Sequence, residues 1–240
     1  MKRIPTLVLL SLATVTIATV TSCGPGQNES DGEAPSGALF DAPSTETTAP
    51  GLAPIIPEDA PTLVFLGDSL GAGLHLGEHQ ALPALLQAQL AEDGYPFHLT
   101  NSSESGRTTA GGVTALKWAL RSEPDIVVIE LGGNDGLRGI SVEEIEKNLR
   151  SLVVTARESG ATVLLLGVRM PPNYGQYAAS FDALYPRLAA ELEIAFVPYF
   201  MEGVGGVAEM NLPDGMHPTA KGHERLAENV RPGLTQILKP

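Results

Sequence analysis

The sequence has 240 residues, of which 43% are hydrophobic, and a formal net charge of −13 at pH 7. This acidic balance argues against nucleic acid as a partner, because binding a phosphate backbone requires clustered Lys and Arg side chains. A single cysteine excludes a framework of disulfides within the chain.

The first 23 residues have the composition of an export signal. Met1 to Arg3 form a basic start, and the run from Ile4 to Val20 is apolar and uncharged. This order is typical of a secretory signal rather than of a spanning helix. Cys23 follows in V-T-S-C-G, which resembles the lipobox of bacterial lipoproteins. The resemblance implies lipid attachment at Cys23 and an exported, membrane-anchored protein facing the periplasm or cell exterior. A plain secretory signal is the alternative.

Residues 24–60 are rich in Pro, Gly, Ser, Thr and Ala and contain seven acidic residues but no Lys or Arg. Such a segment cannot bury enough apolar surface to offset its ordering entropy, so we predict a disordered acidic linker. Residues 61–240 are long enough to bury a full core, and we expect them to form one folded domain.

Strand-like and helical patterns alternate along this domain. The expected strands are Thr62–Leu66, Phe97–Thr100, Ile126–Leu131, Thr162–Val168 and Ile194–Val197. Three of these runs are almost continuous Val, Ile and Leu, as in strands buried on both faces of a parallel sheet. The expected helices are Gln80–Glu92, Gly112–Arg121, Ser141–Glu158, Tyr177–Leu192 and Thr219–Leu238. The alternation predicts a doubly wound, three-layer α/β/α sandwich with a five-stranded parallel sheet.

Local signals add detail to these elements. Ser141 and Glu144 have the spacing of a capping box at the start of a helix. We expect Trp118 in the core, and we expect Pro186 and Pro232 to kink or end their helices.

Glycine and polar residues follow every expected strand, where a doubly wound fold places its functional groups. These segments are Gly67–Ser69, Asn101–Gly112, Gly132–Gly136, Arg169–Gly175 and Pro213–Thr219.

Ser69 is the expected nucleophile, and it needs a base because an alcohol is hardly ionised at neutral pH. His217 is the expected base, with Asp214 three residues earlier to orient the imidazole. The alternative is that both residues decorate a turn before a helix. Gly67, Ser69 and Gly71 also match the G-x-S-x-G elbow of α/β-hydrolases. That elbow should follow several strands, whereas Ser69 follows the first, so we interpret the match as a coincidence of Gly71.

Three groups could stabilise an oxyanion: the backbone N–H of Ser69, the backbone N–H of Gly106 and the side-chain amide of Asn134. The alternative for both glycine-rich segments is an ordinary connection between strand and helix. We predict that Asp68 is structural, as an N-cap or a brace between loops, rather than a second base.

These pieces, in this order, resemble the SGNH or GDSL-type serine hydrolase superfamily. The matching blocks are G-D-S-L at Gly67–Leu70, S-G-R-T-T-A-G at Gly106, G-G-N-D with Asn134, and D-G-M-H-P with Asp214 and His217. The segments G-V-R-M-P-P-N-Y-G and L-P-D-G-M-H-P-T-A-K-G-H are similar to the arylesterase, thioesterase I and lysophospholipase L1 group.

The resemblance implies a flavodoxin-like fold and a serine esterase that forms an acyl-enzyme and needs no cofactor. The substrate would be a small-molecule or lipid ester: an acyl or aryl ester, a lysophospholipid or a thioester. His75 and His79 lie four residues apart, but no third metal ligand is evident, so we expect no metal site. Arg107 departs from the aspartate that this group often has, which leaves details of the entrance open.

The expected pocket walls are Leu137, Met170, Tyr174 and Tyr177, with ordinary packing as the alternative for each. No long insertion could form a lid, and we hypothesise that the loop Gly136–Gly139 moves on binding. A carbohydrate O-acetylesterase is the rival enzyme, and a ligand-binding surface lipoprotein is the rival without catalysis.

Overall fold

The computed structural model describes residues 55–238. The predicted export signal, the lipid attachment at Cys23 and most of the predicted linker lie outside the described residues. Among residues 55–238, no helix combines the length and apolar character needed to cross a membrane.

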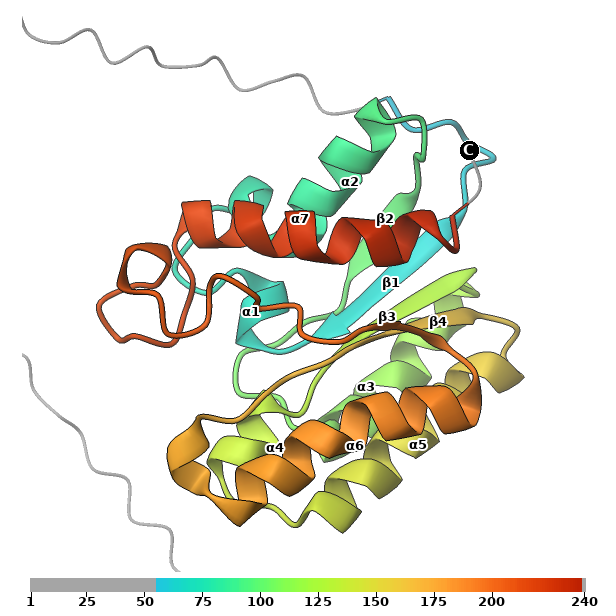
Figure 1. Ribbon diagram of the computed structural model, residues 1–240. Coiled ribbons are helices and arrows are strands. Elements are labelled where there is room, and N and C mark those ends of the chain that lie inside the picture. Colours follow the sequence, from blue (N-terminus) through green and yellow to red (C-terminus); the bar gives the residue numbers. More distant parts are fainter. Residues whose placement is uncertain (1–54, 239–240) are drawn as a thin grey trace, which may run out of the picture. The chain divides into compact units, whose positions relative to one another are not determined.

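The described residues form a five-stranded parallel sheet between two layers of helices, which confirms the predicted fold class (Figure 1). The strands lie in the order β2-β1-β3-β4-β5, and their bounds are β1 Thr62–Gly67, β2 His98–Asn101, β3 Ile126–Glu130, β4 Thr162–Leu166 and β5 Ala195–Val197. The central strand β3 is buried along its whole length, so its two faces supply the core against both helical layers.

The helices divide between the two faces of the sheet (Figure 1). One layer contains α1 Ser69–Ala72, α2 Leu82–Glu92 and α7 Ala220–Thr235. The other contains α3 Thr109–Ala119, α4 Gly133–Leu137, α5 Val142–Glu158 and α6 Gln176–Leu192. Four short 3-10 helices complete the described fold: η1 Glu78–Gln80, η2 Leu120–Ser122, η3 Pro172–Tyr174 and η4 Ala208–Met210.

The expectation that Trp118 lies in the core was wrong, and neither predicted helix ends at its proline. Trp118 is 67% exposed, with the Arg121 guanidinium over its ring. It lies about 200° around the helix axis from the buried Leu116, and therefore on the solvent face of α3. Helices α6 and α7 continue through Pro186 and Pro232. Both prolines are exposed, so water can satisfy the carbonyl group that each leaves without its helical partner.

Helix α5 begins at the predicted cap, where the Ser141 hydroxyl accepts a hydrogen bond from the N–H of Glu144 at 3.3 Å. An apolar stripe along one face is buried, at Ile145, Leu149, Leu152, Val153 and Ala156. The stripe determines which face of α5 packs towards the core.

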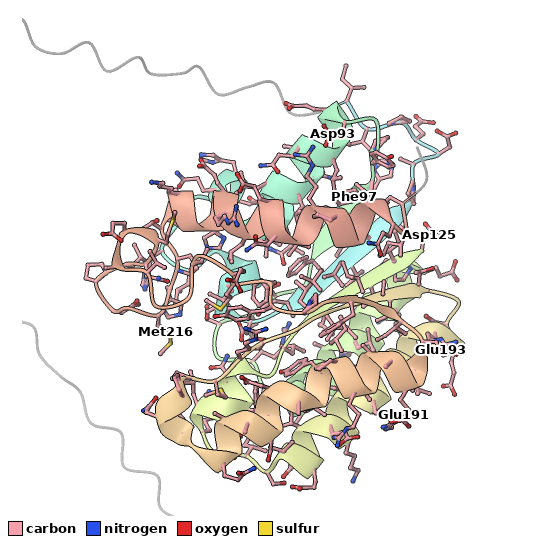
Figure 2. The ribbon with its side chains drawn as sticks, viewed as in Figure 1. Asp93, Phe97, Asp125, Glu191, Glu193 and Met216 are labelled. Carbon is pink, nitrogen blue, oxygen red and sulfur yellow. The ribbon has the colours of Figure 1, made fainter. Side chains whose placement is uncertain are left out.

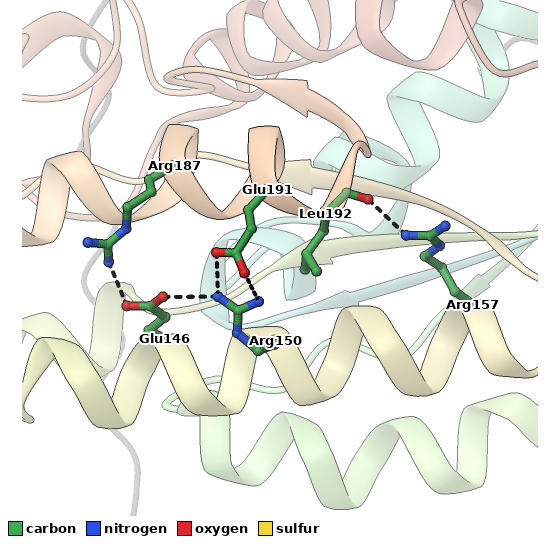
Figure 3. Close-up of polar contacts among 6 residues, drawn as sticks. All are labelled: Glu146, Arg150, Arg157, Arg187, Glu191 and Leu192. Carbon is green, nitrogen blue, oxygen red and sulfur yellow. Dashed lines mark hydrogen bonds and ion pairs between the residues drawn. The ribbon is translucent and has the colours of Figure 1, made fainter.

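Ion pairs join the outer surfaces of α5 and α6 (Figure 3). Arg150 donates two hydrogen bonds to Glu191, both at 2.7 Å, and one to Glu146 at 3.1 Å. Glu146 also accepts from Arg187 at 2.5 Å, and Arg157 donates to the last carbonyl of α6 at 2.8 Å. Because most of these groups are well exposed, they fix the mutual orientation of the two helices more than they stabilise the fold.

His223 joins α2 and α7, two of the three helices of the first layer, in the core. Its side chain is 1% exposed on α7, and its Nδ1 accepts a hydrogen bond from the N–H of Leu82 at 3.0 Å. The preceding Ala81 has no side-chain oxygen to cap α2, so His223 performs that task from another helix. Burial, and to a lesser degree the charge of His217, lower the pKa of His223 to about 4.

This pKa makes stability depend on pH. The unfolded chain binds a proton at His223 near pH 6.5, while the folded chain resists protonation until about pH 4, so the free energy of unfolding falls as pH drops through that window. The variant His223→Gln keeps an acceptor for Leu82 without titrating. We expect wild type to lose about 2 kcal/mol more stability than His223→Gln between pH 7 and pH 4.5. Urea unfolding of both proteins measures this difference, and equal losses would contradict it.

Candidate active site

The loops at the carboxyl ends of the strands converge at one edge of the sheet. Ser69 is the first residue of α1, directly after β1, whereas His217 lies in the loop that leads into α7. These residues are 148 positions apart in sequence, yet His217 Nε2 lies 3.0 Å from Ser69 Oγ. Parallel strands bring such distant segments to the same edge.

Asp214 completes the arrangement on the other side of the imidazole. Its Oδ2 lies 2.7 Å from His217 Nδ1, and its Oδ1 accepts from the backbone N–H groups of Met216 and His217 at 2.9 and 3.0 Å. These bonds, led by that from the imidazole, hold the pKa of Asp214 well below its usual range, so this carboxyl is ionised. A carboxylate at Nδ1 keeps the proton there and leaves Nε2 free to accept the Ser69 proton.

A short closed loop carries both residues. Asn211 and Pro218 form an isolated antiparallel bridge, and Leu212 N–H donates to the carbonyl of His217 at 2.7 Å. Gly215 adopts a φ of 68°, which allows the chain to turn between Asp214 and His217. The sequence motif P-D-G-M-H-P therefore folds back on itself and brings its acid to its base.

The three predicted oxyanion donors also lie at this edge. The N–H groups of Ser69 and Gly106 donate to no acceptor among residues 55–238. Gly106 has a φ of 81°, which favours glycine, and Arg138 donates to its carbonyl at 3.1 Å. Asn134, in α4, donates one amide hydrogen to Asp68 Oδ2 at 2.9 Å, which leaves the second amide hydrogen available.

Asp68 performs both of its predicted structural roles. One oxygen caps α1 by accepting from the N–H of Leu70 at 3.1 Å, while the other holds the Asn134 amide. The side chain is 4% exposed, and burial raises its pKa above the ordinary value. Asp68 thus links the nucleophile loop to α4.

The sequence reasoning missed Glu130, the last residue of β3. Its side chain is 1% exposed, and its Oε2 accepts from the N–H groups of Asp68 and Gly71, both at 3.1 Å. An acidic residue at the end of the run I-V-V-I-E-L was the signal, since a carboxylate in a buried strand requires specific partners.

Arg107 supports the nucleophile loop instead of shaping the entrance. Its side chain is 10% exposed and donates to the carbonyl of Gly67 at 3.3 Å, to the carbonyl of Ser102 and to Glu104 at 2.9 Å. A guanidinium in this place ties the end of β1 to the loop after β2.

A cavity of about 900 Å³ opens beside Ser69 and His217. Its apolar wall includes Leu137, Val168, Met170, Pro171, Pro172 and Ala178. Leu137 and Met216 are 41% and 48% exposed, and both also line the cavity. Figure 2 shows Met216 on the loops at this end of the domain.

Two of the four predicted pocket residues, Leu137 and Met170, line this cavity, but Tyr174 and Tyr177 do not. The Tyr177 hydroxyl donates to the carbonyl of Ile140 at 2.6 Å, and the rings of Tyr174 and Tyr177 lie 6.3 Å apart. Tyr177 therefore faces the connection between α4 and α5, where its hydroxyl is satisfied, and Tyr174 packs beside it.

His75 and His79 were considered as metal ligands because they lie four residues apart in the sequence. Among the residues that the structure describes, no group of three or more His, Cys, Asp or Glu could hold a metal ion. His75 lies edge-on against the His217 ring, with centroids 6.2 Å apart.

Comparison with known families and proteins gives consistent matches. The model of the GDSL-like Lipase/Acylhydrolase family matches residues 65–225. Esterase TesA of Pseudomonas aeruginosa is 49% identical over 181 residues, which cover 75% of this chain and 90% of that protein. A thioesterase 1/protease 1/lysophospholipase L1 of Escherichia coli is 37% identical over 171 residues, which cover 70% of this chain and 81% of the relative.

A solved structure shares the fold. The psychrotrophic esterase EstA from a Pseudoalteromonas species, inhibited by monoethylphosphonate, superposes with a TM-score of 0.70 at 30% sequence identity. The match covers 74% of this chain and 98% of that one.

Proposed function

The chain belongs to the GDSL-like lipase/acylhydrolase family and is an ester-hydrolysing serine hydrolase, and from this premise we propose how its residues act. Ser69 is the nucleophile, His217 is the general base and Asp214 orients and stabilises the imidazole. The observation that carries this proposal is the continuous relay from Asp214 Oδ2 to Nδ1 at 2.7 Å and from Nε2 to Ser69 Oγ at 3.0 Å.

The reaction proceeds in two halves. His217 takes the hydroxyl proton as Ser69 Oγ attacks the carbonyl carbon of the ester, and the imidazolium then protonates the leaving alcohol. In the second half, His217 takes a proton from water as the water attacks the acyl-enzyme, and the imidazolium returns that proton to Ser69 Oγ as the ester bond breaks and the acid is released. Asp214 stays ionised throughout, because its low pKa keeps the negative charge beside the imidazolium.

The tetrahedral intermediate places a negative charge on the former carbonyl oxygen. The unpaired N–H groups of Ser69 and Gly106 and the second amide hydrogen of Asn134 are suited to bind it. Two of these donors are backbone groups, and the third is held by Asp68, so little reorganisation is needed as the charge develops.

We propose carboxylic esters with apolar acyl chains as the substrate class. The cavity beside Ser69 has an apolar wall and is large enough for a chain of several carbons. Lysophospholipids and thioesters have such chains and belong to the same proposal. Export and lipid attachment at Cys23 remain part of it as well, and they rest on the sequence of residues 1–23.

An acyl-chain series of nitrophenyl esters tests this substrate class. Each buried methylene contributes about 0.8 kcal/mol, so burial of about two of the additional methylenes of octanoate corresponds to about tenfold. We therefore expect kcat/KM for octanoate to exceed that for acetate by about tenfold or more. The variant Leu137→Ala should reduce this preference about threefold, since it removes part of the cavity wall.

Val154→Ala is the matched control, because Val154 is also an exposed apolar residue, at 39%, but does not line the cavity. Its octanoate-to-acetate ratio should equal that of wild type. A wild-type preference for acetate, extended to acetylated sugars, would instead support a carbohydrate O-acetylesterase.

A further inference from the structure

Glu130 takes no part in the proposed bond-making steps, yet it is the ionisable group most deeply placed behind the nucleophile. It ends β3, and its backbone pairs in register with Gly67, the last residue of β1. Its side chain is 1% exposed. A carboxyl group buried this completely requires partners that offset its desolvation.

Those partners are backbone groups on both sides of Ser69. Glu130 Oε2 accepts from Asp68 N–H and from Gly71 N–H at 3.1 Å each, while the Asp68 carboxylate accepts from the N–H of Leu70. Every N–H from position 68 to position 71 is therefore engaged except that of Ser69. The donor that the oxyanion needs is the one that these two carboxyl groups leave unpaired.

The glycines of the nucleophile loop make room for this arrangement. A Cβ at Gly67 would lie 2.5 Å from Glu130 Oε2, and a Cβ at Gly71 would lie 2.8 Å from the Phe65 ring. Neither glycine has a positive φ, so space rather than backbone conformation requires glycine at both positions. The agreement of Gly71 with an elbow motif thus has a structural cause: a Cβ there would also clash with Ser103 Oγ, so the close packing of α1 against Phe65 and Ser103 requires glycine.

The protonation of the pair is consistent with a fixed clamp in which Glu130 is neutral. Burial, and secondly the charge of Asp68, raise the pKa of Glu130 well above its ordinary value. Two adjacent buried carboxylates cannot both remain ionised at low cost, so a proton stays on the pair. A neutral Glu130 keeps a carbonyl oxygen that accepts from N–H groups, as the amide of glutamine does.

We propose that Glu130 is a positioning residue for catalysis: it clamps the backbone on both sides of Ser69 and aims the Ser69 N–H at the oxyanion. This role rests on the proposed function, because it concerns a donor to the intermediate of that reaction. Loss of the clamp should therefore weaken transition-state binding more than substrate binding.

The test compares kcat and KM of four variants, with circular dichroism to establish the folded fraction. Glu130→Leu should lower kcat about 10²-fold with KM changed less than about threefold, as for the loss of one oxyanion donor. Glu130→Gln should stay within about fivefold of the wild-type kcat, since its amide oxygen can accept the same bonds. Glu130→Asp keeps the carboxyl group but withdraws its oxygen by one methylene, and should lower kcat at least about tenfold.

Asp125→Ala is the matched control. Asp125 Oδ2 accepts from the N–H and hydroxyl of Thr62 at 2.8 and 3.0 Å, so it bridges β1 and the residues before β3 as Glu130 bridges their other ends. Figure 2 shows Asp125 and Met216 at opposite ends of the domain. Asp125→Ala should lower the unfolding temperature and leave kcat unchanged.

A folded Glu130→Leu with wild-type kcat would overturn the proposal. If Glu130→Leu does not fold, the order of the other two variants decides, and a kcat of Glu130→Asp equal to or above that of Glu130→Gln would overturn it. Ser69→Ala in the same assay distinguishes failure of the Glu130 proposal from failure of the proposed function. Unchanged activity in Ser69→Ala would refute the proposed function itself.

Discussion

Replacing Ser69 with alanine is expected to lower kcat for a nitrophenyl ester by about 10⁵-fold, because the acyl-enzyme can no longer form. Alanine fits the same space at the start of α1, and the capping bond between Asp68 and the N–H of Leu70 does not involve the hydroxyl. The variant should therefore fold with wild-type stability. Its residual rate would come from the oxyanion donors and from substrate binding alone.

Steady-state kinetics on matched preparations measure this loss. Ser159→Ala serves as the control, because the Ser159 hydroxyl only donates to the carbonyl of Ala156 at the end of α5. A wild-type rate in that control shows that contaminating esterases do not account for the difference. A Ser69→Ala preparation as active as an active wild type would refute the mechanism, whereas no activity in either protein would favour a ligand-binding protein.

Replacing His217 with alanine is expected to lower kcat by about 10⁴- to 10⁵-fold, since the imidazole that takes the proton from Ser69 Oγ in the proposed mechanism is lost. Because Ser69 and His217 act as one unit, the double variant should be no slower than the slower single variant. If the two residues acted independently, the factors by which the single substitutions lower kcat would multiply in the double variant. This non-additivity distinguishes a base that activates Ser69 from a histidine that only contacts the substrate.

A double-mutant cycle on one nitrophenyl ester provides the measurement. His79→Ala is the histidine control, because His79 is exposed in η1 and does not line the cavity. Its kcat should equal that of wild type. A double variant about 10⁸-fold or more slower than wild type would contradict the relay.

Much of the fold was predictable because buried strands of a parallel sheet must be apolar on both faces. The runs Thr62–Leu66 and Ile126–Leu131 differ by one residue from β1 and β3. The last expected strand, Ile194–Val197, likewise differs from β5 by one residue. The division of the helices between two faces of the sheet followed from the alternation of strands and helices.

The position of the site was also predictable, since the carboxyl ends of parallel strands share one edge. Contact between Ser69 and His217 was not, because nothing local to either residue fixes a distance between segments 148 positions apart. We expected this contact only because several motifs occur in the order that is typical of the SGNH or GDSL-type superfamily.

The errors concern side-chain direction. Residue type favoured the cavity for Tyr177 and the core for Trp118, but position around a helix decided both. Glu130 escaped notice because a strand that is apolar except at its end still predicts a strand, whereas its partners lie at the start of α1, about 60 residues earlier in the sequence. Only the assembled sheet shows which backbone groups that carboxyl group reaches.

The bridge between Asn211 and Pro218 has a mechanical consequence. It closes the segment that holds Asp214 and His217, so thermal displacement of this segment carries acid and base together and preserves their mutual geometry. The nucleophile is carried separately by the sheet and α1. In the proposed mechanism, the separation of Ser69 Oγ and His217 Nε2 is therefore a distance through which motion of the segment alters proton transfer.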